Sequence, residues 1–268
     1  MTKAFGINNA LVKPLFTPFL KPFAQKFADD VFSLDQQIAD SSLQKASAHF
    51  CQKYTAGVVS KGIEYLPSEG PLLILSNHPG ICDTVALFSS IYRNDLKVLA
   101  LDRPFLRVLP HLSEKLFLLS EESSQRANAL RYSARYMQLG GCILTFPAGK
   151  IEPDPKLRSG ALESVSNWSK SLDIFTRLIP DLHIVVAMVA GVFSPHALTH
   201  PLVRLRRSTD SKELFAAALQ IARKKYQSNT IEIAFSKPIS VSADNNYRLD
   251  DLIIVRAKEA LESLDAYL

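Results

Sequence analysis

A histidine and an aspartate follow an apolar run in an arrangement suited to acid–base chemistry. The run LLILS covers residues 72–76, and the segment NHPGICD then places Asn77, His78 and Asp83. If a helix begins just after His78, Asp83 lies about one turn inside it and can reach back to one imidazole nitrogen. That contact would fix the tautomer and leave the other nitrogen free as a general base.

Two other interpretations of this segment stay open. Asn77 can cap the helix while His78 merely packs. Cys82 follows His78 by four residues and can share its helical face as a nucleophile, although a thiol inside an apolar helix is more often part of the packing. No Gly-x-Ser-x-Gly turn supplies a serine nucleophile, so a His–Asp pair suits the activation of a substrate hydroxyl.

Strand and helix patterns alternate along most of the chain. This alternation is typical of an α/β domain with a mostly parallel, mixed sheet that is flanked by helices. We expect a helical N-terminal extension over residues 1–55 and a single α/β domain over residues 56–268. The expected strands cover residues 57–66, 72–76, 96–101, 116–120, 142–146, 184–193 and 231–236, and the expected helices cover residues 29–55, 80–92, 105–112, 123–139, 211–226 and 249–265.

The candidate chemical groups follow two of these strands. In open α/β sheets the reacting groups lie beyond the carboxyl ends of the strands. His78 and Asp83 come after the strand at residues 72–76, and the segment FPAGK, Phe146–Lys150, comes at the end of the strand at residues 142–146. This agreement favours chemistry over simple capping.

Composition narrows the class of protein further. The 268 residues are 47% hydrophobic and 21% charged, as in globular chains, and the net charge of +5 leans only mildly toward anionic partners. Three widely spaced cysteines form no C-x-x-C pair, so we expect no metal site, no disulfide framework and a reducing, cytoplasmic location. The basic clusters at residues 204–207 and 223–225 accompany no nucleic-acid-binding motif, and we expect no nucleic-acid partner.

The N-terminal segment is basic and aromatic. Residues 1–28 contain four lysines, no acidic residue and a series of phenylalanines, a composition suited to lying in a membrane interface. The alternative is a helical lid that packs Phe16, Phe19 and Phe23 onto its own domain. Three prolines at positions 14, 18 and 22 are expected to interrupt a regular helix.

Four blocks of the chain, taken in order, resemble a known family. NHPGICD resembles the Asn-His-x-x-x-x-Asp signature of the glycerolipid acyltransferases, the lysophosphatidate and glycerol-3-phosphate acyltransferases. ILTFPAGK resembles the Phe-Pro-Glu-Gly-Thr-Arg block of that family, HIVVAMVAG takes the place of its later buried block, and IEIAFSKPIS is similar to its C-terminal strand and Lys-Pro-Ile turn. The resemblance extends from about Gly57 to the C-terminus.

The resemblance implies acyl transfer without a covalent acyl-enzyme. His78, oriented by Asp83, would take a proton from an acceptor hydroxyl as it attacks an acyl-CoA or acyl carrier protein thioester. No metal or cofactor is implied. Phe146, Pro147, Gly149 and Lys150 would help to hold the phosphate of a glycerophosphate or lysophospholipid acceptor, and the protein would work at a membrane surface as a peripheral protein.

The sequence departs from the family pattern in its cationic blocks. Ala148 and Lys150 stand where the family usually carries Glu and Thr-Arg, and lysine lacks the two-pronged donor of arginine. In the segment LFLLSEESSQR, residues 116–126, Ser120 stands where the middle block of the family has an arginine. Arg126 and Arg103 are therefore the next candidates for binding a phosphate. Two further cations are candidates on the same grounds, Lys156 and Arg158.

Four functions are compatible with these patterns. The preferred one is an O-acyltransferase acting on a glycerophosphate or a lysophospholipid. The same dyad could instead activate water in a thioesterase, or acylate an alcohol or amine that has no phosphate. The last is a lipid-binding protein whose catalytic site has decayed, which the departures at Ala148 and Lys150 would explain.

Overall fold

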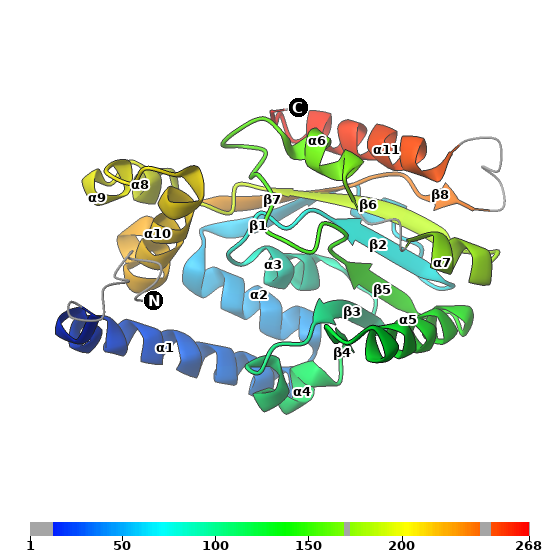
Figure 1. The fold of residues 1–268 in the computed structure, drawn as a ribbon, viewed down its shortest axis with the longest axis horizontal. Helices are drawn as coiled ribbons and strands as arrows, with labels where there is room; N and C mark the ends of the chain where they lie inside the picture. The colour runs from blue at the N-terminus through cyan, green and yellow to red at the C-terminus, as the bar shows by residue number, and fades with distance from the viewer. Residues whose placement is uncertain (1–12, 169–171, 242–247, 268) are drawn as a thin grey trace.

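A mixed sheet of eight strands forms the centre of the structure, with helices on both faces (Figure 1). The computed structural model describes residues 13–168, 172–241 and 248–267, except for the side chains of residues 13–20 and 173. The strands are β1 (Gly57–Lys61), β2 (Leu72–Ser76), β3 (Leu96–Leu101), β4 (Leu116–Leu119), β5 (Cys142–Thr145), β6 (His183–Ala190), β7 (Thr230–Phe235) and β8 (Ile239–Ser240).

Helices of very different length connect and cover these strands. The longer ones are α1 (Lys13–Asp40), α2 (Leu43–Tyr54), α3 (Asp83–Ser90), α5 (Ser123–Gln138), α10 (Thr209–Ala222) and α11 (Leu249–Ser263). The shorter ones are α4 (Pro110–Ser113), α6 (Ala161–Ser166), α7 (Leu172–Leu178), α8 (Pro195–Leu198), α9 (Pro201–Arg204) and the 3-10 turns η1 (Ile63–Tyr65), η2 (Leu106–Val108) and η3 (Lys224–Tyr226).

The sheet is mostly parallel, as the sequence predicts. Its strand order is β1-β7-β6-β2-β5-β3-β4, and β8 pairs with β6. Strand β2 runs parallel to β5 on one side and to β6 on the other, whereas β7 and β8 run antiparallel to β6. The carboxyl ends of β2, β5, β3, β4 and β6 therefore meet at one edge of the sheet.

Alternating residues of the central strands fill two separate cores. In β2, Leu73 and Leu75 pack with α5, α6, α7 and α11 on one face, and Leu72 and Ile74 pack with α2 and α3 on the other. All four side chains are fully buried. Helices on both faces explain why this strand is apolar throughout rather than alternately polar.

The expected single helix at residues 29–55 is two helices. Ser42 begins α2 as its N-cap, and its side chain accepts a hydrogen bond from the backbone N–H of Lys45. The expected interruption by prolines is wrong, because α1 includes positions 14, 18 and 22. The proline at position 14 lies in the first turn, where the backbone N–H has no helical partner, and each later proline removes only one backbone donor.

Helix α1 packs on its own domain through its second half. Phe27 lies edge-on to Phe50 and Tyr54 of α2, with ring centroids 6.2 and 5.4 Å apart. The guanidinium of Arg223 lies 5.7 Å from the centroid of the Phe23 ring. These contacts agree with the lid interpretation for Phe23. Residues 1–12 and the side chains of positions 16 and 19 lie outside the described part of the chain.

Several expected boundaries are wrong for local reasons. Strand β1 ends at Lys61, because Gly62 turns the backbone at φ 73° into η1. The helix expected at residues 80–92 begins only at Asp83, because Gly80 and Cys82 have positive φ values of 131° and 65°. The helix expected at residues 211–226 ends as an α-helix at residue 222, and the short helices α6 to α9 were not expected because they carry no extended hydrophobic periodicity.

No helix within the described ranges is both long enough and apolar enough to cross a lipid bilayer.

The end of β6 depends on a glycine. Gly191 has φ 75°, and a Cβ there would lie 2.6 Å from the backbone oxygen of Thr230. We expect Gly191→Ala to lower the free energy of unfolding by about 2–4 kcal/mol, from backbone strain plus overpacking. Gly70→Ala is the control, because its φ is 82° but a Cβ meets nothing within 4 Å. Urea denaturation compares the two variants, and equal losses would contradict this account.

Candidate active site

The site begins where β2 ends. Asn77 is buried, its Oδ1 accepts a hydrogen bond from the Val189 backbone at 2.7 Å, and its Nδ2 donates to the Val189 carbonyl at 2.9 Å. The interpretation of Asn77 as a helix cap is therefore wrong. Its side chain continues the pairing of β2 with β6 by one residue and fixes the backbone just before His78.

The predicted contact between His78 and Asp83 is present. The Nδ1 atom of His78 lies 2.7 Å from Oδ2 of Asp83. The same oxygen accepts the Gly80 backbone N–H at 2.8 Å, and Oδ1 accepts the Thr84 hydroxyl at 3.0 Å. The Asp83 side chain is 2% exposed and that of His78 is 32% exposed. Asp83 thus orients the ring through Nδ1 and leaves Nε2 as the nitrogen that can act as a base.

The route of the chain to this contact differs from the expected one. Asp83 is the first residue of α3 rather than one turn inside it, and the turn through Gly80 and Cys82 brings its carboxylate back to the imidazole. A carboxylate at a helix N-terminus is also stabilised by the helix dipole.

The surroundings of His78 favour its protonated form. Burial lowers the pKa of His78, but the hydrogen bond with Asp83 and the charges of Asp83 and Glu152 outweigh it, and the net pKa is above its ordinary value. The ring is therefore a stronger base than a free imidazole.

Cys82 does not fit the nucleophile interpretation. Burial raises the pKa of this thiol well above its ordinary value, and the nearby Cys51 and Asp83 raise it further. The side chain packs against both the core under α3 and the cluster between α1 and α2. Because the reactive species is the thiolate, a thiol with a raised pKa is a poor nucleophile.

The segment after β5 lies beside the dyad. The ring of Phe146 stacks obliquely on the His78 imidazole, with centroids 4.7 Å apart and planes at 38°. Gly149 has φ 63°, and its backbone N–H donates to the Phe146 carbonyl at 3.1 Å, which makes a tight turn after Pro147. Lys150 follows Gly149 and is exposed.

The two predicted arginines lie farther from the dyad. Arg103 is exposed just after β3, and β5 separates β3 from β2, which puts the two strands about 10 Å apart at the usual strand spacing. Arg126 lies in α5, and its Nε donates to the Ser120 carbonyl at 3.1 Å. Among the described residues, neither guanidinium makes a hydrogen bond or ion pair with His78 or Asp83.

Two other candidate cations are paired with carboxylates. Lys156 lies 2.5 Å from Glu232, and Arg158 lies 3.0 Å from Glu213. These pairs give both side chains a role in holding the loop after β5. Within the described residues, no three His, Cys, Asp or Glu side chains lie close enough to hold a metal ion.

Glu152 is a residue at the site that the sequence patterns did not single out. Its carboxylate is buried, and Oε2 accepts the backbone N–H of His78 at 2.8 Å. No motif marked this residue, because it lies in an irregular loop and approaches His78 only through the fold. The block that resembles the family's Glu-containing motif has Ala148 instead, and Ala148 packs against the core.

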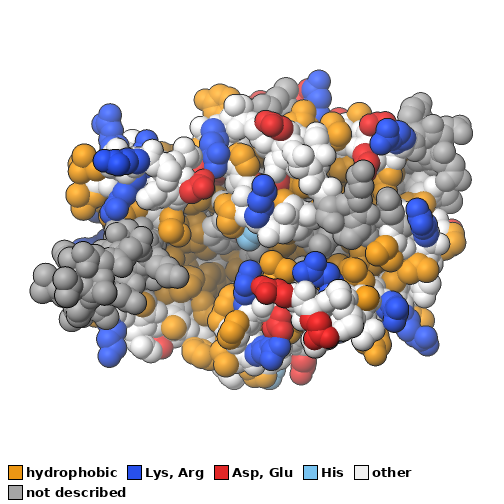
Figure 2. Space-filling view, viewed as in Figure 1, with side chains coloured by type: hydrophobic (Ala, Val, Ile, Leu, Met, Phe, Trp, Pro, Cys, Tyr) orange, Lys and Arg blue, Asp and Glu red, His pale blue; other side chains and the backbone are white. Residues whose placement is uncertain are grey.

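Figure 2 shows a hollow near the middle of one face, in which a histidine side chain is visible. Hydrophobic side chains, Lys or Arg side chains and some Asp or Glu side chains border this hollow.

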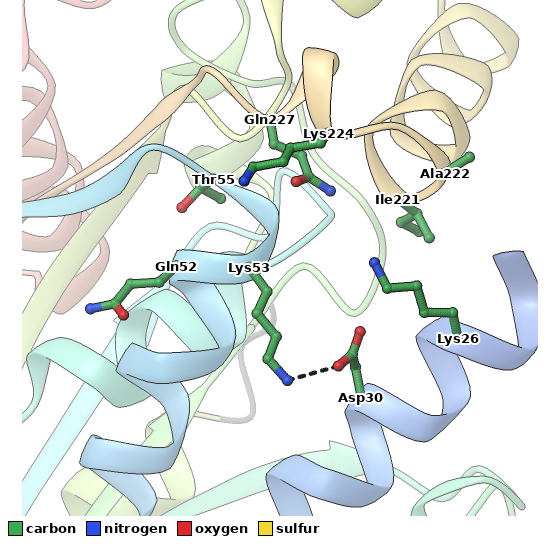
Figure 3. Close-up of a pocket in the computed structure, with 9 residues that line it drawn as sticks. All are labelled: Lys26, Asp30, Gln52, Lys53, Thr55, Ile221, Ala222, Lys224 and Gln227. Carbon is green, nitrogen blue, oxygen red and sulfur yellow. Dashed lines mark hydrogen bonds and ion pairs between the residues drawn. The ribbon is translucent and has the colours of Figure 1, made fainter.

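A separate cavity of about 480 Å³ lies between α1, α2 and η3 (Figure 3). Lys26 and Asp30 reach it from α1, and Asp30 is tied to Lys53 at 2.7 Å. The lining of this cavity includes none of the predicted site residues, and the Asp30 carboxylate in it is already paired with Lys53. The candidate active site is therefore the one at His78.

Comparisons with known proteins agree with this fold. Residues 57–185 match the family model described as Acyltransferase, a range that includes His78, Asp83 and Glu152. The crystal structure of the 1-acyl-sn-glycerophosphate (LPA) acyltransferase PlsC from Thermotoga maritima is similar, with a TM-score of 0.54 and 15% sequence identity, over 98% of this chain and 99% of that chain. No curated protein matches the chain in sequence.

The matched segment contains β1 to β5 and the start of β6, together with His78 and Asp83. Residues 57–185 therefore resemble the acyltransferase family, as the motif resemblance predicts, and at 15% identity the likeness to PlsC is one of fold.

Asp83 controls the basicity of His78. We expect Asp83→Asn to lower the pKa of the His78 imidazole, because the substitution removes a hydrogen-bonded negative charge that favours the protonated ring. NMR titration of the His78 ring protons measures it. The exposed Asp250→Asn in α11 is the control. An unchanged pKa in the Asp83 variant would contradict the assigned pairing.

Proposed function

We propose that the chain transfers a fatty acyl group from an acyl thioester to a hydroxyl of a glycerophosphate or lysophospholipid. The observation that carries the proposal is the 2.7 Å contact between His78 Nδ1 and Asp83 Oδ2 on an acyltransferase fold. This contact orients the ring and leaves Nε2 available for the proton of the acceptor.

The proposed reaction needs no protein nucleophile. Nε2 of His78 takes the proton of the acceptor hydroxyl while the oxygen attacks the thioester carbonyl carbon. A carbon–oxygen bond forms, the carbon–sulfur bond then breaks, and the imidazolium returns the proton to the departing thiolate. Asp83 stays ionised throughout and stabilises the imidazolium, as a buried carboxylate does beside a catalytic histidine.

The turn after β5 is the proposed site for the acceptor phosphate. Lys150 is exposed there, directly after Gly149, which has a φ of 63° and turns the backbone. Arg103 follows the neighbouring strand β3 at the same sheet edge and supplies the second cation of this proposal. We infer a peripheral membrane location on the cytoplasmic side, because long-chain acyl donors and lysophospholipids partition into the interface and α1 exposes Lys21 and Lys26.

Removal of the base should slow acyl transfer strongly. We expect His78→Ala to lower the rate by about 10²- to 10⁴-fold, the usual contribution of a positioned general base. Thiol release from a long-chain acyl-CoA is measured with glycerol 3-phosphate, with lysophosphatidate and with neither. The exposed His49→Ala in α2 is the matched control and should behave as wild type.

The three reaction mixtures distinguish the candidate functions. Release that needs an acceptor and is lost in His78→Ala supports the acyltransferase and identifies its acceptor. Release without an acceptor that is lost in the same variant indicates a thioesterase. Release that persists in His78→Ala would overturn the assignment of the base, and no release from either acyl-CoA or acyl carrier protein would favour a lipid-binding protein.

Lys150 should affect the acceptor more than the chemistry. We expect Lys150→Gln to raise the KM for a phosphorylated acceptor by about tenfold with little change in kcat, because an exposed charge–phosphate contact acts mainly in binding. Steady-state kinetics with the acceptor varied measures it. Lys258→Gln, an exposed lysine on α11, is the control. A fall in kcat at unchanged KM would contradict the proposed phosphate contact.

A further inference from the structure

A single residue of the loop after β5 holds both backbone polar groups of His78. Oε2 of Glu152 accepts the His78 N–H at 2.8 Å, and the backbone N–H of Glu152 donates to the His78 carbonyl at 2.9 Å. The backbone from which the imidazole projects is therefore fixed independently of the contact that Asp83 makes with the ring.

The other oxygen of the Glu152 carboxylate is held by one residue of α6 and by one residue just after that helix. Oε1 of Glu152 accepts the Ser164 hydroxyl at 2.6 Å and the Trp168 indole N–H at 2.9 Å. Glu152 is 1% exposed, so these hydrogen bonds replace the water that the carboxylate has lost. A backbone N–H, a hydroxyl and an indole N–H all serve as donors here, and an acceptor-only ionised carboxylate matches that set.

Anchoring of the loop alone does not account for a buried charge at this position. Two residues farther on, the fully buried carboxylate of Asp154 already accepts the backbone N–H groups of Gly191 and Val192 at 2.9 and 2.8 Å, which ties the loop to the end of β6. Burial of a second carboxylate costs free energy, which the hydrogen bonds from His78, Ser164 and Trp168 offset. One of its oxygens contacts the backbone of His78, and its charge acts on that imidazole.

We propose that Glu152 is a positioning residue for acyl transfer, which fixes the His78 backbone and whose negative charge stabilises the imidazolium formed when the ring takes the hydroxyl proton. This inference rests on the proposed function and adds a second carboxylate to the dyad. Asp83 orients the imidazole ring through Nδ1, and Glu152 holds the His78 backbone from which that ring projects. Proton transfer is sensitive to both, because it requires hydrogen-bond distance to the acceptor oxygen.

Two substitutions separate the effect of the Glu152 charge from the effect of its side-chain length. Glu152→Gln keeps the size and removes the charge, so it should lower the pKa of His78 and move the acid limb of the kcat–pH profile to lower pH. We expect its plateau kcat to fall roughly 10- to 100-fold, with a smaller change in KM. Glu152→Asp keeps the charge but is one methylene shorter, so it should lose kcat while its acid limb stays near that of wild type.

Control variants make the outcome interpretable. Glu163→Gln changes an exposed glutamate in α6, and its pH profile and kcat should equal those of wild type. Circular dichroism and denaturation report whether each variant is folded. If Glu152→Gln does not fold, Glu152→Asp carries the test, and a wild-type kcat in that variant overturns the inference.

The His78→Ala and Glu152→Gln variants together distinguish an error in the role of Glu152 from an error in the proposed function. Activity that persists in His78→Ala would overturn the base itself. If His78→Ala is inactive, and Glu152→Gln is merely less stable with a wild-type kcat and acid limb, Glu152 only anchors the loop and the positioning role is wrong. A shifted acid limb in Glu152→Gln, together with an inactive His78→Ala, supports it.

Discussion

The position of the His78 imidazole depends on the parallel pairing of β2 with β5 and β6 on its two sides. The side chains of β2 are completely buried between helices on both faces, so the strand has no freedom to shift its register. Asn77 extends that pairing with its side-chain amide by contacting Val189. The chain leaves the sheet only at His78, and the catalytic candidate therefore projects directly from the end of a fully buried strand.

Buried carboxylates organise the polar edge of the sheet. Asp83, Glu152 and Asp154 are almost completely buried, and each accepts several hydrogen bonds from backbone or side-chain donors. Buried charge is tolerable only when its oxygens are satisfied in this way. The result is an imidazole with one carboxylate on its ring and another on its backbone, in surroundings that exclude water from the carboxylates while the ring itself stays partly exposed.

The loop after β5 shows how irregular backbone can be held as firmly as a helix. Phe146 packs on the imidazole, Glu152 holds the His78 backbone, and Asp154 ties the loop to the end of β6. Ion pairs of Lys156 with Glu232 and of Arg158 with Glu213 extend this attachment. A short stretch of chain without a long helix or strand thus connects three neighbouring strands at the site.

The sequence alone determined the class of fold, the order of most strands and helices, and the pairing of His78 with Asp83. These features depend on local hydrophobic patterns and on residues close together in the chain, which a sequence displays directly. Only the tertiary structure decided the antiparallel pairing of β6 with β7, the late start of α3 and the contact of Glu152 with His78. These depend on residues far apart in sequence or on unusual backbone dihedrals. A buried carboxylate in an irregular loop acquires its partners only when the strands that flank it have come together.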